Sequence, residues 1–352
     1  MADQLGTGRE TVLALDGGNS KTDVIVLTAA GDVLARARSG PFLPQLVGAP
    51  AAVESFRPAV EAVLRSVEGN RATHLAAYLA NADLPEETEA IRVAVQRQGW
   101  AGTVTVENDT FALLRAGTEH DFGVAVVCGA GINCVGIAPE GTQLRFPALG
   151  RITGDWGGGL GLAEEVLWWA TRAEDGRGPT TSLAAAAAAH FGVPDATAVA
   201  AHFHLGVLPA VRMHELVTLL FAAAGAGDEV ARSIVLRQAE EIVLLVTTTL
   251  ARLRMQQTPV DVVLGGGILA AREAVLMDPL TARLAELAPT ARPTFLTTPP
   301  IVGAGLLGLE QLWNRRVGSD PAGLAAALRR ARDSIGAEPG NGVLTAPTKG
   351  HQ

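Results

Sequence analysis

The same plan of three short apolar segments separated by tight turns occurs twice in this chain of 352 residues. The first copy covers residues 11–35, and the second covers residues 123–146. In each copy an apolar run, a glycine-rich turn and another apolar run predict antiparallel strands joined by a tight turn. Because such self-similarity is typical of duplicated architectures, we expect two related α/β halves.

The segments after each copy alternate between the helical and the strand period. In the first half we expect helices at 51–67, from Pro85 and at 111–116, and strands at 74–80 and 103–106. In the second half we expect helices within 161–255, at 270–288 and at 301–313, and strands at 260–264 and 294–296. We therefore expect an N-terminal α/β domain (10–120), a C-terminal α/β domain with a helical insertion (121–318), and a last segment (319–352) with a helix and a disordered tail.

Composition and charge exclude several classes of function. The net charge of −8, without a basic cluster, argues against a nucleic-acid partner. No apolar run approaches the roughly 18 residues of a membrane span, so we expect no membrane partner. The start of the chain lacks the pattern of a signal peptide, and two cysteines are too few for a disulfide framework. We expect a cytoplasmic protein in which Cys128 and Cys134 are reduced core residues.

The turn in the first copy carries chemistry. Gly17 and Gly18 can adopt positive φ and leave backbone N–H groups bare, which suits phosphate oxygens. Asp16 would repel such an anion unless a cation lay between them, and Mg²⁺ prefers carboxylate, phosphate and water oxygens. An ordinary glycine-rich hairpin is the alternative interpretation of these residues.

Further short motifs follow in a fixed order, and together they resemble a known family. They are the segment from Asp16 to Thr22, Asn108-Asp109, the segment from Gly129 to Asn133, Gly154-Asp155, the segment from Gly265 to Gly267, and the segment from Pro300 to Ala304. This order is similar to that of the BadF-type ATPases and their N-acetylglucosamine kinase branch, within the actin, sugar kinase and chaperone ATPase superfamily. The resemblance covers roughly residues 11 to 316.

The resemblance implies an α/β fold with two ribonuclease H-like, actin-type ATPase domains and a cleft for nucleotide and substrate between them. It implies ATP and Mg²⁺ as cofactors, with Asp16 at the metal. The residues expected to bind the nucleotide lie in the three glycine-rich turns. They are Gly17, Gly18, Asn19, Ser20, Lys21, Thr22, Gly129, Ala130, Gly131, Gly265, Gly266 and Gly267. A simple structural turn is the alternative at each of these places.

Asp109 is the expected catalytic residue. In the kinases of this family the aspartate in this position is the general base, and a carboxylate within hydrogen-bond reach can take the proton of an attacking hydroxyl. Asp109 follows an apolar strand, so it could equally be the N-cap of the next helix, and so could Asn108.

The substrate side is expected to involve Asn108, Asp109, Asn133, Asp155 and Gln45. The resemblance assigns Asp155 to the sugar hydroxyls; capping of the next helix is its alternative role. Trp156 beside it could stack on a sugar ring or pack in the core. In the N-acetylglucosamine kinases an asparagine of the loop after the third strand reaches the sugar. Residues 39–45 contain no asparagine, and only Gln45 could replace it, which puts the preference for an acetamido group in doubt.

The sequence therefore predicts an ATP-dependent kinase that phosphorylates a hydroxyl, in first place the 6-hydroxyl, of N-acetylglucosamine, glucosamine or a related hexose. One alternative is an ATPase that activates a protein partner, as the dehydratase activators of the family do. Another is a sugar-binding protein with little turnover. A homodimer is implied by the resemblance alone.

Overall fold

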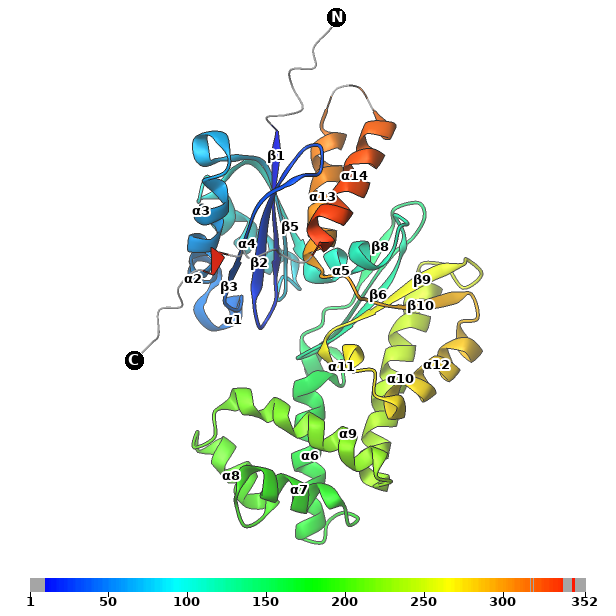
Figure 1. Cartoon of the computed structure of the whole chain (residues 1–352). Coiled ribbons are helices and arrows are strands. Elements are labelled where there is room, and N and C mark those ends of the chain that lie inside the picture. Colours follow the sequence, from blue (N-terminus) through cyan, green and yellow to red (C-terminus); the bar gives the residue numbers. More distant parts are fainter. Residues whose placement is uncertain (1–9, 317, 319, 338–343, 346–352) are drawn as a thin grey trace, which may run out of the picture. The chain divides into compact units, whose positions relative to one another are not determined.

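The structure is a computed structural model that describes residues 10–316, 318, 320–337 and 344–345. Its contacts divide the chain into two units (Figure 1). The first unit holds the described residues up to Asp121 together with those from Leu296 onward, and the second is Phe122–Phe295.

The sheet of the first unit has six strands in the order β11-β3-β2-β1-β4-β5. They are β1 (Thr11–Gly17), β2 (Thr22–Thr28), β3 (Val33–Ser39), β4 (Ala72–Leu79), β5 (Ala101–Asn108) and β11 (Leu344–Thr345). The strands β1, β2 and β3 pair antiparallel, as the repeated plan predicts. The strands β4 and β5 run parallel to β1, so the carboxyl ends of these three strands share one edge.

Helices cover both faces of this sheet because its strands are apolar on both sides. They are α1 (Pro44–Val47), α2 (Ala49–Ser55), α3 (Arg57–Leu64), α4 (Pro85–Gln96), α5 (Asp109–Gly117), α13 (Ile301–Asn314) and α14 (Pro321–Gly336), with a 3-10 turn, η1, at Glu68–Asn70. Leu13 and Leu15 of β1 lie in one buried cluster with Phe56 and Val60.

The helix α13 lies on the other face of the first sheet. Its approach depends on small residues: a Cβ added to Gly308 would lie 2.6 Å from Val12, and one added to Gly303 would lie 1.8 Å from the Ala112 carbonyl oxygen of α5. The expected second domain, 121–318, included this helix, and the contacts correct that boundary. Helical periodicity indicates a buried face, but it does not indicate which sheet that face covers.

The sheet of the second unit has five strands in the order β10-β9-β6-β7-β8. They are β6 (Gly123–Cys128), β7 (Ile132–Ile137), β8 (Gln143–Arg145), β9 (Val260–Gly265) and β10 (Ala291–Phe295). The strands β6, β7 and β8 pair antiparallel, and β9 runs parallel to β6 and β10. The three-stranded plan of the first unit therefore recurs, as expected from the sequence.

The second unit also holds a large helical part. Its helices are α6 (Gly158–Glu174), α7 (Ser182–Phe191), α8 (Ala196–His204), α9 (Glu215–Gly225), α10 (Glu229–Arg252), α11 (Gly267–Ala270) and α12 (Ala274–Leu287), with 3-10 turns η2 (Gly150–Thr153) and η3 (Ala210–His214). Much of the apolar core of this unit comes from α6, α9 and α10, and α10 packs on β6 and β7.

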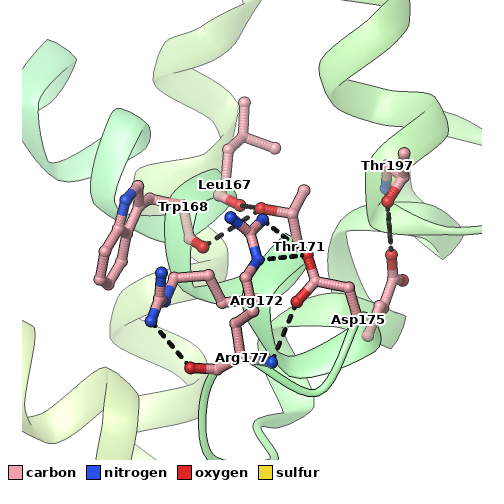
Figure 2. Close-up of polar contacts among 8 residues, drawn as sticks. Leu167, Trp168, Thr171, Arg172, Asp175, Arg177 and Thr197 are labelled. Carbon is pink, nitrogen blue, oxygen red and sulfur yellow. Dashed lines mark hydrogen bonds and ion pairs between the residues drawn. The ribbon is translucent and has the colours of Figure 1, made fainter.

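The end of α6 is fixed by side chains of its last turns (Figure 2). Thr171 donates from its hydroxyl to the Leu167 carbonyl at 2.8 Å, and Arg172 donates to the Arg177 carbonyl at 2.8 Å. The Arg177 N–H in turn donates to the Asp175 carboxylate at 3.0 Å. These bonds define the turn between α6 and α7.

Two expectations concern the C-terminal segment and membranes. The expected C-terminal helix is α14, but most of the expected tail lies outside the described residues. The strand at Leu344–Thr345, which pairs parallel with β3, was not expected. Within the described ranges no single helix is long and apolar enough to cross a membrane, although the bent pair of α7 and α8 would pass by length and composition.

Candidate functional site

The carboxyl end of β1 places Asp16 among other acidic groups. In the ladder Asp16 lies opposite Asp23 of β2 and Tyr78 of β4. Burial, and then the charges of Asp109 and Asp23, raise the pKa of Asp16 to about 8, while the nearby charge of Lys21 opposes the shift. Asp16 is therefore mostly protonated near pH 7, and a cation beside it would favour its charged form.

Asp23 is a residue of this site that the sequence analysis missed. It is 8% exposed, and both of its carboxylate oxygens are occupied. Lys21 Nζ lies 2.5 Å from Oδ2, and Arg38 Nε lies 2.6 Å from Oδ1. The ammonium group of Lys21, which we expected to bind nucleotide, is thus held beside the first turn by Asp23.

The two glycines of the first turn differ from the expectation in their conformation. Neither Gly17 nor Gly18 has a positive φ in the structure. Gly17 is needed for another reason, because a Cβ there would lie 2.6 Å from Leu79 Cδ2. The Gly18 N–H donates to the Lys21 carbonyl at 2.8 Å and closes the turn. The expectation of bare N–H groups from left-handed glycines at these positions was wrong.

The tip of the first turn still offers donors. Asn19 and Ser20 are exposed, and their backbone N–H groups donate no hydrogen bond within the described part of the chain. Thr22, in contrast, is fully buried, and its hydroxyl donates to the Gly40 carbonyl at 3.0 Å. Of the residues expected to bind nucleotide here, Asn19 and Ser20 therefore leave backbone donors accessible, whereas the Thr22 hydroxyl is engaged.

Asn108 and Asp109 stand where β5 ends and α5 begins. Asn108 is the N-cap: its Oδ1 accepts from the Thr110 N–H at 3.1 Å and from the Thr110 hydroxyl at 2.6 Å. It is 1% exposed, and its Nδ2 donates to Asp83 Oδ1 at 2.9 Å. Asn108 is therefore the cap, and the half-buried Asp109 is the first residue of the helix.

Asn81 is a second residue whose importance the sequence did not indicate. It has a positive φ of 63°, and its Nδ2 donates to Asn19 Oδ1 at 2.8 Å and to the Phe42 carbonyl at 3.1 Å. The Asn81 carbonyl accepts a hydrogen bond from Gln45 Nε2 at 3.2 Å. The structure therefore brings the tip of the first turn and the expected substrate residue Gln45 to one side chain.

The glycine turn of the second unit is held by the start of α6. The Gly129 N–H closes the turn on the Gly131 carbonyl at 2.9 Å. The Gly159 N–H donates to the Gly129 carbonyl at 2.7 Å, and the Leu160 N–H donates to the Ala130 carbonyl at 2.9 Å. Backbone groups alone make these contacts, so the turn and the helix start form one structure.

Glycine is required where the turn and α6 meet. Gly158 has a φ of +71°, and a Cβ there would lie 2.4 Å from the carbonyl carbon of Gly131. Gln238 of α10, which is fully buried, accepts a hydrogen bond from the Gly158 N–H at 2.9 Å. Its Nε2 has no hydrogen-bond partner among the described residues. No local pattern in the sequence connects Gln238 with this turn, because 80 positions separate it from Gly158.

A hollow of about 340 Å³ lies beside the second turn. Its lining includes Ala130, Gly131, Gly150, Asp155, Gly157 and Leu160. The structure thus joins Ala130 and Gly131, expected at phosphate, to Asp155, expected at the sugar.

The carboxylate of Asp155 is held by its own loop. Its Oδ2 accepts from the Thr153 hydroxyl at 2.7 Å and from the Gly150 N–H at 3.1 Å. Both bonds use the same carboxylate oxygen, which orients the other, Oδ1. Asp155 does not cap α6, whose N-cap is Gly157, so the capping alternative was wrong.

Trp156 and Asn133 were also expected on the substrate side. Trp156 is 6% exposed, its Nε1 donates to Glu165 at 3.3 Å, and Arg237 lies over its ring at 4.2 Å, so packing is its role. Asn133 lies on β7, where its Oδ1 accepts from the Cys134 N–H at 2.7 Å. The role of Asn133 in substrate binding remains a prediction.

The third glycine turn, between β9 and α11, also serves close packing. Gly266 has a φ of +91°, and a Cβ there would lie 2.4 Å from the Cys128 carbonyl oxygen. A Cβ on Gly267 would meet open space. The structural-turn alternative therefore explains Gly266, while contact of Gly265 and Gly267 with a nucleotide remains a prediction.

Cysteine and metal chemistry are limited at these turns. Cys128 and Cys134 are free and buried, as expected, and burial raises the pKa of each thiol to about 12. In the described ranges no group of three or more His, Cys, Asp or Glu residues could hold a metal ion. A cation at Asp16 would therefore need most of its ligands from phosphate and water oxygens.

Comparison with known proteins gives consistent results. A model of the BadF/BadG/BcrA/BcrD ATPase family matches residues 13–308. N-acetyl-D-glucosamine kinase of Dictyostelium discoideum is 25% identical over 315 residues, which covers 86% of this chain and 98% of that protein. N-acetylmuramic acid/N-acetylglucosamine kinase of Clostridium acetobutylicum is 26% identical over 263 residues, or 73% of this chain and 85% of that protein.

Similarity to a solved structure supports the fold. A protein from Chromobacterium violaceum proposed to be an N-acetylglucosamine kinase aligns with a TM-score of 0.66 at 19% identity. The alignment covers 86% of this chain and 99% of that protein. The two-sheet α/β fold expected from the sequence is therefore confirmed.

Proposed function

Because the chain belongs to the BadF/BadG/BcrA/BcrD ATPase family, we propose that it is an ATP-dependent kinase of an amino sugar. Its acceptor is a hydroxyl of N-acetylglucosamine, glucosamine or a related hexose, with the 6-hydroxyl as the first candidate. Support comes from the two curated relatives, both named as kinases that include N-acetylglucosamine among their substrates.

The observation that carries this proposal is the arrangement at the start of α5. Asn108 caps the helix and leaves Asp109 in the first turn, close enough to Asp16 to raise its pKa. A general base needs a carboxylate that is held within hydrogen-bond reach of the proton that it removes. We assign to Asp109 the removal of the proton from the acceptor hydroxyl.

The residues around Asp16 fit a magnesium ion. Burial and the acidic neighbours Asp109 and Asp23 make a charged Asp16 unfavourable, and a divalent cation would relieve that cost. When bound with ATP, Mg²⁺ supplies neutralisation of phosphate charge. Asp16 would hold the ion or its water shell, and Lys21 adds a positive charge at the same turn.

On the substrate side we assign Asp155 to sugar hydroxyls, through the carboxylate oxygen that its loop leaves oriented. The hollow beside it has about the volume that small-ligand sites require. We assign Gln45 to the acceptor because it is tied to Asn81, which also contacts the first turn. A longer side chain than asparagine would reposition this contact, so glucosamine stays beside N-acetylglucosamine as a candidate acceptor.

The test is coupled ADP release with Mg·ATP against hexoses, amino sugars, N-acetylated sugars and polyols. We expect strong stimulation by one amino sugar or its N-acetyl derivative. If no acceptor changes the rate of ADP release, the result would contradict the kinase proposal and favour a partner-dependent ATPase. Light scattering on the same sample tests the homodimer that the resemblance implies.

A further inference from the structure

Another hollow, of about 670 Å³, lies in the first unit, at the opposite ends of its strands from Asp16. It opens beside the start of β5, the last strand of the sheet. Its lining includes Arg71, Arg92, Arg315, Gly99, Gly102 and Thr103. None of the described residues that line it carries a carboxylate.

The three guanidinium groups differ in how they are balanced. Arg92 is paired with Glu89 through two bonds of 2.7 Å, so its charge is largely compensated. Arg71 donates to the Ala101 carbonyl at 3.1 Å, and Arg315 donates to His74 at 3.4 Å. Within the described ranges neither Arg71 nor Arg315 is paired with a carboxylate. Two positive charges therefore remain without an anion in one hollow.

The histidine behind Arg315 cannot supply a counter-charge. His74 is fully buried, and burial, together with the charge of Arg315, lowers its pKa below the usual value. Its Nε2 lies 2.8 Å from Gln311 Oε1, which requires a proton on Nε2 and leaves Nδ1 as an acceptor. Thr103 Oγ1 lies 2.9 Å from Nδ1, and Arg315 Nη1 lies 3.4 Å from it. The imidazole is therefore neutral and carries no counter-charge for Arg315.

The lining is also open to a ligand at the backbone. Gly99 presents no side chain and a Cβ there would meet open space, whereas a Cβ on Gly102 would lie 3.0 Å from the Thr73 carbonyl oxygen. Because β5 is an edge strand, the side of its backbone that faces away from β4 has no neighbouring strand within the described sheet. An anion could approach both the arginines and this strand edge.

We propose that this hollow binds the phosphate group of a small metabolite, with Arg71 and Arg315 as its main ligands. Guanidinium forks match phosphate oxygens in geometry and in charge. Two arginines without acidic partners suit a dianion better than a single carboxylate.

The proposed site is separate from Asp16. In β4, His74 precedes Tyr78 by four residues, and Tyr78 is the neighbour of Asp16 in the ladder. At about 3.3 Å per residue, this places the two ends roughly 13 Å apart along the strand. The hydrogen bond of 3.0 Å from Gln311 to the Tyr78 hydroxyl continues the contacts of His74 in that direction.

The test is calorimetric titration of the full chain, without nucleotide, with inorganic phosphate, pyrophosphate and glucosamine 6-phosphate. We expect binding that weakens at least about tenfold in the double variant Arg71→Ala/Arg315→Ala, because each lost charged hydrogen bond costs roughly that factor. Equal binding of the three probes identifies free phosphate as sufficient. Tighter binding of glucosamine 6-phosphate identifies a phosphorylated sugar.

The matched control is Arg65→Ala/Arg329→Ala, which removes the same charge from two exposed arginines that do not line the hollow. This control variant should bind the three probes as tightly as the wild type does. The nitrogen resonances of His74 should shift on titration in the wild type and in the control only. Absence of binding, equal binding by both double variants, or loss of binding in Lys21→Ala instead would overturn the proposal. The outcome does not depend on sugar kinase activity.

Discussion

The first turn of each unit joins the first two strands of its sheet, yet the two turns are stabilised in different ways. Around residues 17–22 ionic contacts add to the backbone bond between Gly18 and Lys21: Asp23 is paired with Lys21 and Arg38, and Asp16 has a raised pKa. Around residues 129–131 the contacts are backbone hydrogen bonds to the start of α6.

This difference predicts how each turn responds to change. A site made by charges depends on pH, on cations and on single carboxylates. A site made by backbone groups depends on the positions at which only glycine fits, because a Cβ there would clash. Substitutions in the two units therefore test this difference.

The largest effect is expected for Asp109→Asn. The amide cannot accept the hydroxyl proton, so kcat should fall roughly 100- to 10,000-fold while nucleotide affinity stays within a few fold. Steady-state rates and nucleotide titration measure the two quantities. The matched control is Asp83→Asn, which changes the hydrogen-bond partner of Asn108. Its kcat should fall much less. Near-normal turnover of Asp109→Asn would move the base to Asp83 or Asp155.

The next effect tests the backbone nature of the second turn. Gly158→Ala forces a side chain into a left-handed conformation and against Gly131, which should cost roughly 2–4 kcal/mol of unfolding free energy. KM for ATP should rise as well. Urea unfolding and steady-state kinetics measure both. Gly225→Ala, at the end of α9 where a Cβ meets open space, should change neither. Equal effects of the two changes would contradict the assignment.

A smaller effect is expected for Gln238→Met. This change keeps the length of the side chain but removes the acceptor of the Gly158 N–H, at a cost of about 1–3 kcal/mol. If Gln238 positions the turn, KM for ATP should rise with little change in kcat. Leu236→Met, at a 48% exposed position of the same helix, is the control. A stability loss without any kinetic change would give Gln238 a purely structural role.

The smallest effect concerns pH and the first turn. The pKa of Asp16 is raised from 3.8 to about 8, so the folded state is favoured below pH 4 and loses that advantage as pH rises through 8. Asp16→Asn lacks this titration. It should be more stable than the wild type by about 1–2 kcal/mol at pH 8, a value discounted for the accessible part of the side chain. The two proteins should converge near pH 4.

Measuring the stability of the same two proteins with Mg²⁺ tests whether the ion binds at Asp16. Magnesium should stabilise the wild type more at pH 8 than at pH 6, because the ion requires the charged carboxylate. It should not stabilise Asp16→Asn. Equal stabilisation of both proteins would place the ion elsewhere.

Much of the fold followed from local patterns. The strands Gly123–Cys128 and Ile132–Ile137 have the bounds that their apolar runs predict, because a glycine turn separates two buried segments. The helix Ile301–Asn314 was also expected, but not its place on the first sheet. That place depends on Gly303 and Gly308, which admit a neighbouring backbone and sheet, and spacing alone does not show which neighbour they admit.

The candidate site was predictable in its residue types more than in its contacts. Glycine at position 17 was expected for its conformational freedom, whereas the structure needs it because Leu79 leaves no room for a Cβ. Asn108 and Asp109 were both possible caps from spacing, and only the geometry distinguishes them. Asp23 contacts Arg38, Asn81 contacts Asn19, and Gln238 contacts Gly158, each at least 15 positions away, so no local motif marks these residues.

The most direct test of the proposed kinase is the fate of the phosphoryl group. We would follow labelled γ-phosphate in a single turnover with enzyme in excess of Mg·ATP, with and without N-acetylglucosamine or glucosamine. The account predicts that the label appears in a sugar phosphate, in equal amount to the ADP formed, and only with an acceptor. Label that appears as inorganic phosphate at the same rate with and without sugar would contradict it.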